Sequence, residues 1–335
     1  MSKTKTSSYD VAKLAGVSPS TISRFFNRTS YVSPDKVQKI EEAIRSLQYK
    51  PNSPLKGKSN QRSMTIGVII QDPVSPFSSH ILNDMEQVLI EQGYSLVISS
   101  AHWNQALATD ALQYLSSNNV DGVIVVTGNL SEQQVVTFAA ETPVVVIGYN
   151  VEGENVRSIH LDQELGGYIA TLHLLQQGHK HIAHIKGLNN QPDSMARFKG
   201  YQRALNEWGL PVMPKLVRQG DFQSETAYQE TLQLIKSNVH FTAIFAANDL
   251  SAYGAIKALH DNNIKVPDDV SVIGFDDLST SQYFTPALTT LKQPIYELGG
   301  VSAQTILNLL RGRDHVVKTP PIDLIVRDST RKLNT

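Results

Sequence analysis

The first fifty residues contain three short segments in which apolar residues recur at helical spacing. Ser7 can cap the first segment and Gly16 ends it, whereas Ser18 and Pro19 begin the second as cap and first-turn residue. Ser33 opens the third. The apolar positions are Val11, Ala12, Leu14 and Ala15, then Ile22, Phe25 and Phe26, then Val37, Ile40, Ile44 and Leu47. Two short helices around a glycine-containing turn, followed by a third, predict a helix-turn-helix head.

From Thr65 onward, short continuous apolar runs alternate with amphipathic segments. The apolar runs are 65–70, 96–100, 122–127 and 143–148, followed by 181–185, 241–246 and 270–274. Continuous apolar strands that alternate with helices predict an α/β fold of parallel sheets covered on both faces. Two such sets predict two similar lobes, with chain crossings near 162–166 and 290–294. Ligands bind outside the carboxyl ends of parallel strands, so we expect a binding site between the lobes.

The composition narrows the class of protein. Of the 335 residues, 41% are hydrophobic and 18% are charged, which is typical of globular proteins. The absence of cysteine excludes disulfides, thiolate metal sites and a cysteine nucleophile. The N-terminus lacks the apolar segment of a signal peptide, and no apolar run approaches the roughly 18 residues that span a bilayer. We therefore expect a cytoplasmic protein without a membrane partner.

The net charge of −1 hides an asymmetry along the chain. Residues 1–62 hold twelve Lys and Arg against four Asp and Glu, a net charge of +8. Residues 63–335 carry a net charge of −9. A basic head on an acidic body indicates that the head alone meets a polyanion, although a basic terminus can also be merely solvated.

In a helix-turn-helix, the second helix lies in the major groove and its first residues face base edges. Here these are Pro19, Ser20 and Thr21, and Arg24 one turn later can donate two hydrogen bonds to a guanine. The alternative is that Arg24 contacts a phosphate or stays solvated. Contacts to phosphate and sugar, which position the protein without reading sequence, are expected from Tyr9, Ser18, Thr21, Ser23, Asn27 and Arg28.

One long motif resembles a known family. It is the run YDVAKLAGVSPSTISR from Tyr9 to Arg24, followed by Asn27, by Val32 and Ser33, and by YKPN at 49–52. This motif closely resembles the head of the lactose/galactose repressor family of bacterial transcription regulators. The resemblance implies that the chain binds double-stranded operator DNA.

The segment after the head departs from the pattern of that family. Members usually have a short hinge helix that reads Ala-Arg-x-Leu, whose leucine enters the minor groove and bends the DNA. Counting from Pro51 to Gly67 without a gap places Lys58 at the leucine position and Leu55 three residues earlier. A proline and a glycine nearby also weaken a helix here. Either Leu55 is the wedge in a shifted register, which we favour, or this hinge bends DNA less. Lys58 remains useful near phosphates in both cases.

Polar residues follow several predicted strands of the body. Carboxylates, an amide, a guanidinium and an aromatic face together suit a polyhydroxylated ring, because they offer hydrogen bonds at its edge and stacking on its apolar face. The alternative is that these residues only cap helices and solvate loops. They are Asp72, Ser75, Phe77, Asp162, Asp221, Phe222, Asn248, Asp249, Asp276 and Asp277, with Arg197 at a helix start.

The same resemblance continues through the body and covers nearly the whole chain. The segments GHKHIA at 178–183, AAND at 246–249, VSVIGFDD at 270–277 and PALTTLKQ at 286–293 resemble the core blocks of the family. The resemblance implies a two-lobed core like that of a periplasmic sugar-binding protein. It also implies that the effector contacts are Asp162, Arg197, Asn248 and Asp276, with Phe222 covering the ligand and Ser75 and Phe77 on a first-lobe loop.

These observations predict three regions. Residues 1–52 form the DNA-binding domain, 53–63 the hinge, and 64–335 the core for effector binding and dimerisation. The first lobe spans about 64–162 and 292–322, and the second about 163–291 and 323–330. The chain stops at Thr335 without the leucine-heptad extension of tetrameric members, so we expect a homodimer. We expect a repressor that needs no cofactor and that a mono- or disaccharide releases from its operator.

Four other readings are weaker. An enzyme lacks support because the chain has no phosphate loop, Gly-x-Ser-x-Gly elbow or His-Glu-x-x-His motif, and Asp276 and Asp277 diverge on a strand end. The basic head and the missing signal peptide disfavour a transport-type binding protein. A metal sensor would need convergent histidines, which is not expected of His173, His179, His181 and His184. An activator, or a repressor that needs a corepressor such as a purine, stays open.

Overall fold

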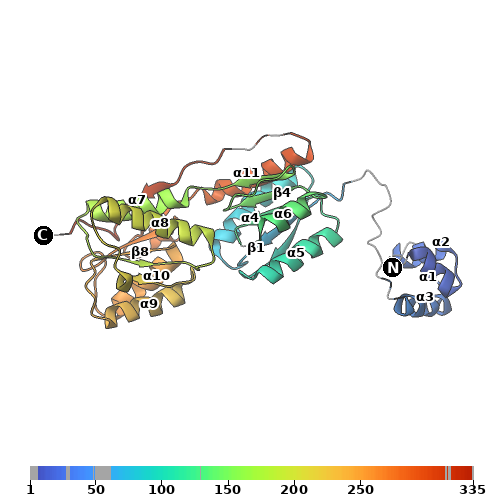
Figure 1. The fold of residues 1–335 in the computed structure, drawn as a ribbon, viewed down its shortest axis with the longest axis horizontal. Coiled ribbons are helices and arrows are strands. Elements are labelled where there is room, and N and C mark those ends of the chain that lie inside the picture. The colour runs from blue at the N-terminus through green and yellow to red at the C-terminus, as the bar shows by residue number, and fades with distance from the viewer. Residues whose placement is uncertain are drawn as a thin grey trace. The chain divides into compact units, whose positions relative to one another are not determined.

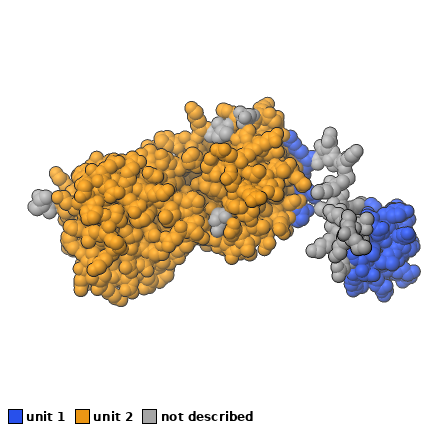
Figure 2. Space-filling view, viewed as in Figure 1, with its two compact units in different colours: residues 1–63, 117–119 blue, residues 64–116, 120–335 orange. Residues whose placement is uncertain are grey.

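The computed structural model describes residues 7–27, 31–47, 49, 62–128, 130–313, 315 and 318–333, with only the backbone of Asn27. The chain divides into two compact units (Figure 2). One comprises residues 1–63 and 117–119, and the other comprises 64–116 and 120–335. The predicted hinge positions Leu55 and Lys58 lie outside the described residues.

Three short helices build the N-terminal unit, as predicted: α1 (Ser8–Ala15), α2 (Pro19–Asn27) and α3 (Pro34–Ser46) (Figure 1). Ser7 and Asp10 form a reciprocal capping box at the start of α1. Gly16 ends α1 with a φ of 64°, a left-handed conformation that glycine adopts without a steric penalty. A small core holds the three helices together, and its buried members are Val11, Ala12, Ala15, Ile22, Ile40, Ala43 and Tyr49.

The first lobe is a five-stranded parallel sheet in the order β2-β1-β3-β4-β5. Helices α4 and α11 pack on one face of the sheet, and α5 and α6 pack on the other. The strands are β1 (Thr65–Ile70), β2 (Ser95–Ser100), β3 (Gly122–Val126), β4 (Val144–Ile147) and β5 (Val156–Ile159). The helices are α4 (Pro76–Glu91), α5 (Gln105–Ser117), α6 (Glu132–Ala139) and α11 (Ile295–Leu310).

The second lobe is a six-stranded sheet in the order β11-β10-β9-β8-β6-β7. Helices α7 and α8 cover one face, and α9 and α10 cover the other. The strands are β6 (Ile182–Ile185), β7 (Val217–Arg218), β8 (Ala243–Ala246), β9 (Ser271–Asp276), β10 (Thr289–Lys292) and β11 (Asp323–Ile325). The helices are α7 (Gln163–Gln176), α8 (Pro192–Glu207), α9 (Ser224–Lys236) and α10 (Asp249–Asp261), with short 3₁₀ turns at Pro214–Leu216 and Ser281–Tyr283.

The chain passes between the two lobes three times. It leaves the first sheet after β5 to form α7, and it returns after β10 to form α11, which packs against α4. It then crosses again to β11, the one antiparallel strand of the second sheet, which pairs with β10. Because these three crossings join the two lobes, the facing ends of the lobes can enclose one pocket between them.

All seven predicted strands are present, whereas the four strands that the sequence analysis missed are short and carry polar residues. Strands β5, β7 and β11 lie at sheet edges, where one side meets no neighbouring strand. Strand β10 contains two fully buried threonines, Thr289 and Thr290. The hydroxyl of Thr290 donates to Asp249, and that of Thr289 bonds Thr330 at 3.0 Å. Internal hydrogen bonds thus allow polar residues inside the sheet, a pattern that apolar runs do not reveal.

Helices α7 and α8 approach so closely that a glycine is required between them. A Cβ on Gly167 would lie 2.2 Å from the backbone oxygen of Arg197. Gly167→Ala is therefore expected to lower the free energy of unfolding of the core by about 1–3 kcal/mol, because α7 must move away from α8. Urea unfolding followed by circular dichroism measures this change.

The matched control is Gln176→Ala, an exposed position on the same helix, which should change the free energy of unfolding by less than about 0.5 kcal/mol. Wild-type stability of the Gly167→Ala variant would show that the close approach of the two helices is not required.

Candidate functional site: a DNA-binding head and an interlobe pocket

The N-terminal end of α2 presents polar side chains on the surface of the head. Ser18, Pro19, Ser20, Ser23 and Arg24 are exposed. The hydroxyl of Ser18 lies 2.8 Å from those of Ser20 and Thr21, and it accepts a hydrogen bond from the backbone N–H of Thr21. These side chains form a hydroxyl-rich, exposed first turn, which is the arrangement that a recognition helix needs.

Tyr9 is also a surface residue of the head, with 67% of its area exposed. Of the other predicted DNA contacts, Thr21 is half-buried, the side chain of Asn27 is not described, and Arg28, Leu55 and Lys58 lie outside the described residues. The individual DNA contacts remain predictions.

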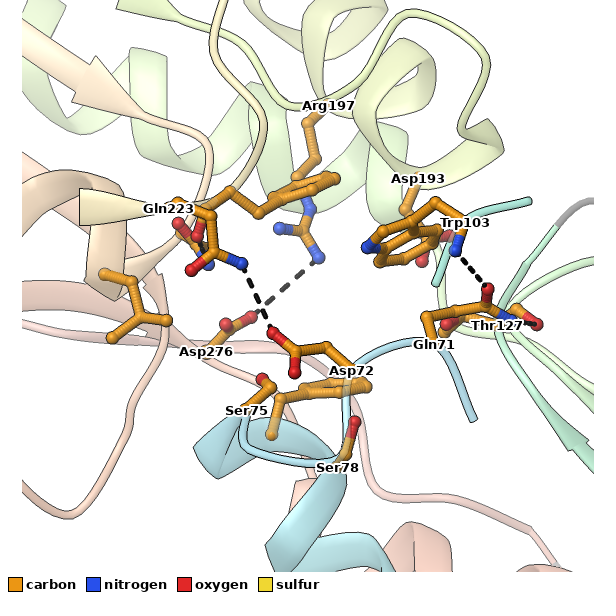
Figure 3. Close-up of a pocket in the computed structure, with 14 residues that line it drawn as sticks. Gln71, Asp72, Ser75, Ser78, Trp103, Thr127, Asp193, Arg197, Gln223 and Asp276 are labelled. Carbon is orange, nitrogen blue, oxygen red and sulfur yellow. Dashed lines mark hydrogen bonds and ion pairs between the residues drawn. The ribbon is translucent and has the colours of Figure 1, made fainter. Parts of the chain in front are cut away.

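The core contains a pocket where the two lobes meet (Figure 3). It lies at the carboxyl ends of strands from both sheets and at the N-termini of α4, α8, α9 and α10, as expected for open parallel sheets. The lining residues are Gln71, Asp72, Ser75, Phe77, Ser78, Trp103, Thr127, Asp193, Arg197, Phe222, Gln223, Asn248, Leu250 and Asp276.

Arg197 of α8 carries the guanidinium at the floor of this pocket and is only 4% exposed. Its Nε donates to Gln163 at 2.9 Å, its Nη1 donates to the backbone oxygen of Ala247, and its plane lies over the ring of Phe275 at 3.8 Å. Burial lowers the pKa of Arg197, whereas the carboxylates of Asp276 and Asp193 act in the opposite direction. Nη2 lies 3.9 Å from Oδ1 of Asp276.

Asp276 ends β9 and faces the same floor. Its Oδ1 accepts a hydrogen bond from Gln293 at 2.7 Å and lies 3.9 Å from Nη2 of Arg197. Burial raises the pKa of Asp276 to about 6, with Arg197 acting against this shift. The neighbouring Asp277 instead pairs with Arg327 at 2.6 Å, so the two side chains diverge as predicted.

An aromatic pair joins the two lobes across the pocket. Trp103, which follows β2, stacks on Phe222, which precedes α9, with ring centroids 6.1 Å apart and an interplanar angle of 26°. A second contact between the lobes is the hydrogen bond that Gln223 donates to Asp72 at 3.4 Å (Figure 3). Trp103 and Phe222 both have a positive φ, of 59° and 70°, as do two other lining residues, Thr127 at 54° and Asp276 at 120°. Such unfavourable backbone conformations cluster at functional sites.

Six of the seven predicted effector residues line this one pocket: Ser75, Phe77, Arg197, Phe222, Asn248 and Asp276. Asp162 is not among the lining residues of this pocket, and its contact with an effector stays a prediction. It is exposed, and its Oδ1 caps α7 by accepting the backbone N–H of Leu165 at 2.8 Å. The next residue, Gln163, is buried and supports Arg197 instead.

The sequence analysis missed Gln71, Trp103, Thr127 and Gln223, among other lining residues. Trp103 and Thr127 follow β2 and β3 directly, so the rule that strand ends carry the site would have found them if it had been applied to every strand. Gln71 holds that side of the pocket together, because it accepts from the backbone N–H of Trp103 at 3.0 Å and donates to the backbone oxygen of Thr127 at 3.3 Å.

The histidines considered for metal binding have other partners. His173 bonds Thr330, His179 lies between Thr242 and the backbone oxygen of Arg331, and His181 packs on His240. His184 is buried inside β6, where desolvation lowers its pKa to about 3. Within the described ranges, no three His, Cys, Asp or Glu side chains come together in a group that could hold a metal ion.

Beneath the pocket, the carboxylate of Asp249 is fully buried. It accepts hydrogen bonds from the backbone N–H of Leu278 at 2.8 Å and from the hydroxyls of Ser281 and Thr290. Burial, reinforced by the charge of Asp276, raises the pKa of Asp249 to about 7 although the hydrogen bonds lower it. This residue ties the first turn of α10 to the loop after β9 and to β10.

Two family descriptions match the chain. Residues 8–52 match "Bacterial regulatory proteins, lacI family", and residues 171–330 match "Periplasmic binding protein-like domain". The HTH-type transcriptional repressor PurR of Histophilus somni (strain 2336) is 32% identical over 328 residues, which are 97% of this chain and 98% of the relative.

Two solved structures share the architecture of the chain. The lac repressor dimer bound to operator and the anti-inducer ONPF has a TM-score of 0.73 and 29% identity, covering 98% of this chain and 100% of that chain. The complex of the transcriptional regulator CelR with cellobiose has a TM-score of 0.70 and 28% identity, covering 97% of this chain and 99% of that chain.

A helix-turn-helix head followed by a periplasmic-binding-protein-like core defines a DNA-binding regulator. The chain belongs to the lacI family of bacterial regulatory proteins and is a DNA-binding transcriptional repressor. Among these relatives, the lac repressor structure is a dimer bound to operator and the CelR structure is a complex with cellobiose, and all of them are transcription regulators. Across the described residues, no helix has the length and apolar character needed to cross a membrane.

The raised pKa of Asp249 predicts how the stability of the core depends on pH. The folded core holds this proton more tightly than the unfolded chain, so the free energy of unfolding should fall as pH rises from the ordinary pKa of 3.8 to about 7. Asp249→Asn removes this titratable group. The free energy of unfolding should then decrease between about pH 5 and pH 7 by roughly 1–2 kcal/mol less than in the wild type. Urea unfolding at the two pH values measures it.

The exposed Asp110 on α5 supplies the control, because Asp110→Asn changes the formal charge equally and should leave the pH dependence as in the wild type. An unchanged pH dependence in Asp249→Asn would contradict the assignment of the shift to this carboxyl group.

Proposed function

We propose that the chain binds a pseudo-palindromic operator as a homodimer and is released from it by a mono- or disaccharide bound in the interlobe pocket. The chemistry of the pocket carries the sugar assignment. Carboxylates, amides, a buried guanidinium and three aromatic rings surround one cavity. These groups match the hydroxyl edges and apolar faces of a pyranose.

The proposed mechanism rests on a ligand that touches both lobes. The pocket is lined from the first lobe by residues such as Trp103 and Asp72, and from the second by residues such as Arg197 and Asp276. A ligand bound to both sides favours one orientation of the lobes over others. The first lobe continues directly from the segment that leads to the head, so a change in its orientation alters the geometry of the two heads in a dimer. Operator and effector then weaken each other by the same factor.

A second candidate for the effector is a purine corepressor, whose binding would strengthen operator binding instead of weakening it. The curated relatives named PurR favour it, whereas the neighbour bound to cellobiose favours a sugar. A purine ring would also find stacking partners in Trp103 and Phe222. The sign of the effect of the ligand on operator affinity separates the two, because an inducer weakens DNA binding and a corepressor strengthens it.

Within the head, Arg24 is proposed to read a guanine in the major groove. Arg24→Ala should weaken operator binding by about 1–3 kcal/mol while weakening binding to random DNA less. Fluorescence anisotropy with both DNAs at fixed salt measures the ratio. Lys39→Ala is the control, since Lys39 is an exposed cation of the head on α3 and should leave that ratio unchanged. An equal loss on both DNAs would make Arg24 a phosphate contact.

In the core, Asp276→Asn keeps the shape of the side chain but removes its charge. It should weaken effector binding by about 1–3 kcal/mol, the cost of losing a charged hydrogen-bond acceptor, and leave operator binding intact. Calorimetry against a panel of sugars and purines, with and without operator, measures affinity and sign together. Arg203→Ala is the control, because Arg203 lies on α8 like Arg197 but pairs with Glu164 and Glu207 at the surface. Wild-type ligand affinity in Asp276→Asn would overturn the pocket assignment.

A further inference from the structure

The charged side chains that line the pocket are unequal in number. Three are carboxylates, Asp72, Asp193 and Asp276, and one is a cation, Arg197. The formal charge of the lining is therefore negative. Charges interact more strongly in a partly desolvated pocket than in bulk water, so the negative charge of the lining affects the binding of any charged ligand.

The positive charge of Arg197 is largely engaged inside the protein. Its Nε and Nη1 donate to Gln163 and Ala247, it lies over the ring of Phe275, and it neighbours Asp276 at 3.9 Å. An anionic ligand would have to share this one guanidinium with the carboxylate already beside it. Arg197 therefore does not form the open cationic site that a phosphate or carboxylate group requires.

Asp193 is engaged less directly, through the charges of Arg197 and His160 at longer range. Among the described residues, its carboxylate has no hydrogen bond and no ion pair within 4 Å, although it lines the pocket and is only partly exposed. In the view of Figure 3, the guanidinium of Arg197 lies between Asp193 on one side and Asp276 and Asp72 on the other. Both oxygens of Asp193 remain available to hydrogen-bond donors of a ligand.

The helix N-termini around the pocket act in the other direction, because their positive ends favour anions. Three of these ends already have a carboxylate in the first turn, namely Asp193 on α8, Glu225 on α9 and Asp249 on α10, whereas α4 has none. The effect of a helix end falls off within a turn, so these three ends are already complemented by the protein itself and offer little to an anionic ligand.

We propose that the pocket selects its effector by charge, and that Asp193 is the selecting residue. The pocket takes a neutral or cationic molecule rich in hydrogen-bond donors, which is an unphosphorylated sugar or an amino sugar, and it rejects phosphorylated and carboxylated sugars. This inference rests on the proposed binding of a small molecule between the lobes, and it narrows the class of that molecule.

The first test measures the local potential without any effector. The chain has two tryptophans, so Trp208→Phe leaves Trp103, at the pocket, as the single tryptophan, whose fluorescence is excited selectively. The quenching constants of its fluorescence by caesium and by iodide are measured at equal ionic strength. Each quenching constant is divided by the constant that the same ion gives with a free tryptophan analogue. Because the pocket is negatively charged, the normalised quenching constant of caesium should exceed that of iodide. Asp193→Asn should lower the ratio of these two constants, caesium to iodide, about twofold.

The control is Glu141→Gln in the same background. Glu141 is exposed and precedes β4, so it lies at the opposite edge of the first-lobe sheet from the pocket, and its substitution removes an equal charge. It should leave the caesium-to-iodide ratio unchanged. More effective quenching by iodide, or the same ratio in Asp193→Asn as in the control, would overturn the proposal.

The second test uses matched ligands on the full chain in calorimetry: glucose, glucosamine and glucose 6-phosphate, and cellobiose with its 6-phosphate. If glucose or cellobiose binds, its 6-phosphate should bind at least about tenfold more weakly than the unphosphorylated sugar. Asp193→Asn should reduce this difference in affinity. Tighter binding of a phosphorylated member would overturn the proposal. If none of these sugars binds but caesium still quenches Trp103 more effectively than iodide, the assignment of a sugar fails and the selection by charge stands.

Discussion

The buried guanidinium of Arg197 is the group on which the floor of the interlobe pocket depends. It donates to Gln163, Gln163 donates to Gln293 at 2.8 Å, and Gln293 donates to Asp276. Gln163 and Gln293 lie at two of the three places where the chain crosses between the lobes. One polar network therefore links the crossing segments to the residues that face the pocket.

Such a network is costly unless each member is paired, because buried charges and amides lose their water. Here the amides of Gln163 and Gln293 are both donors and acceptors, and the aromatic ring of Phe275 supports the guanidinium. The arrangement leaves few free positions: Nη2 of Arg197, the second oxygen of Asp276 and the carboxylate of Asp193. These free positions, rather than the total number of polar residues, decide which ligand the pocket recognises.

The contacts between the lobes at the mouth of the pocket differ in character from those at its floor. The stacking of Trp103 on Phe222 and the 3.4 Å hydrogen bond from Gln223 to Asp72 join residues of loops, and Trp103 and Phe222 have unfavourable backbone conformations. Loop contacts of this kind break at lower cost than the buried network. Relative motion of the lobes is therefore expected to change the mouth of the pocket while the network at the floor persists.

The class of the fold could be predicted from the sequence, because periodicity, capping residues and turn glycines act locally. Ser7, Gly16 and Pro19 placed the first two helices, and seven apolar runs placed seven strands. Strands β5 and β10 were missed because their polar residues are satisfied by tertiary hydrogen bonds. The rule that strand ends carry the site, together with family resemblance, identified six of the pocket residues, including Arg197 and Asp276.

The remaining features of the site depend on how the two lobes pack. The tertiary structure assigned Asp162 to a helix cap and gave Gln163, the next residue, the buried role, a choice that depends on which way each side chain points at the start of α7. It also brought Trp103 against Phe222 and left Asp193 unpaired in the pocket, although these residues are far apart in the sequence. Local rules fix where a helix or strand begins, whereas the packing of two lobes fixes which side chains meet and which polar groups remain free.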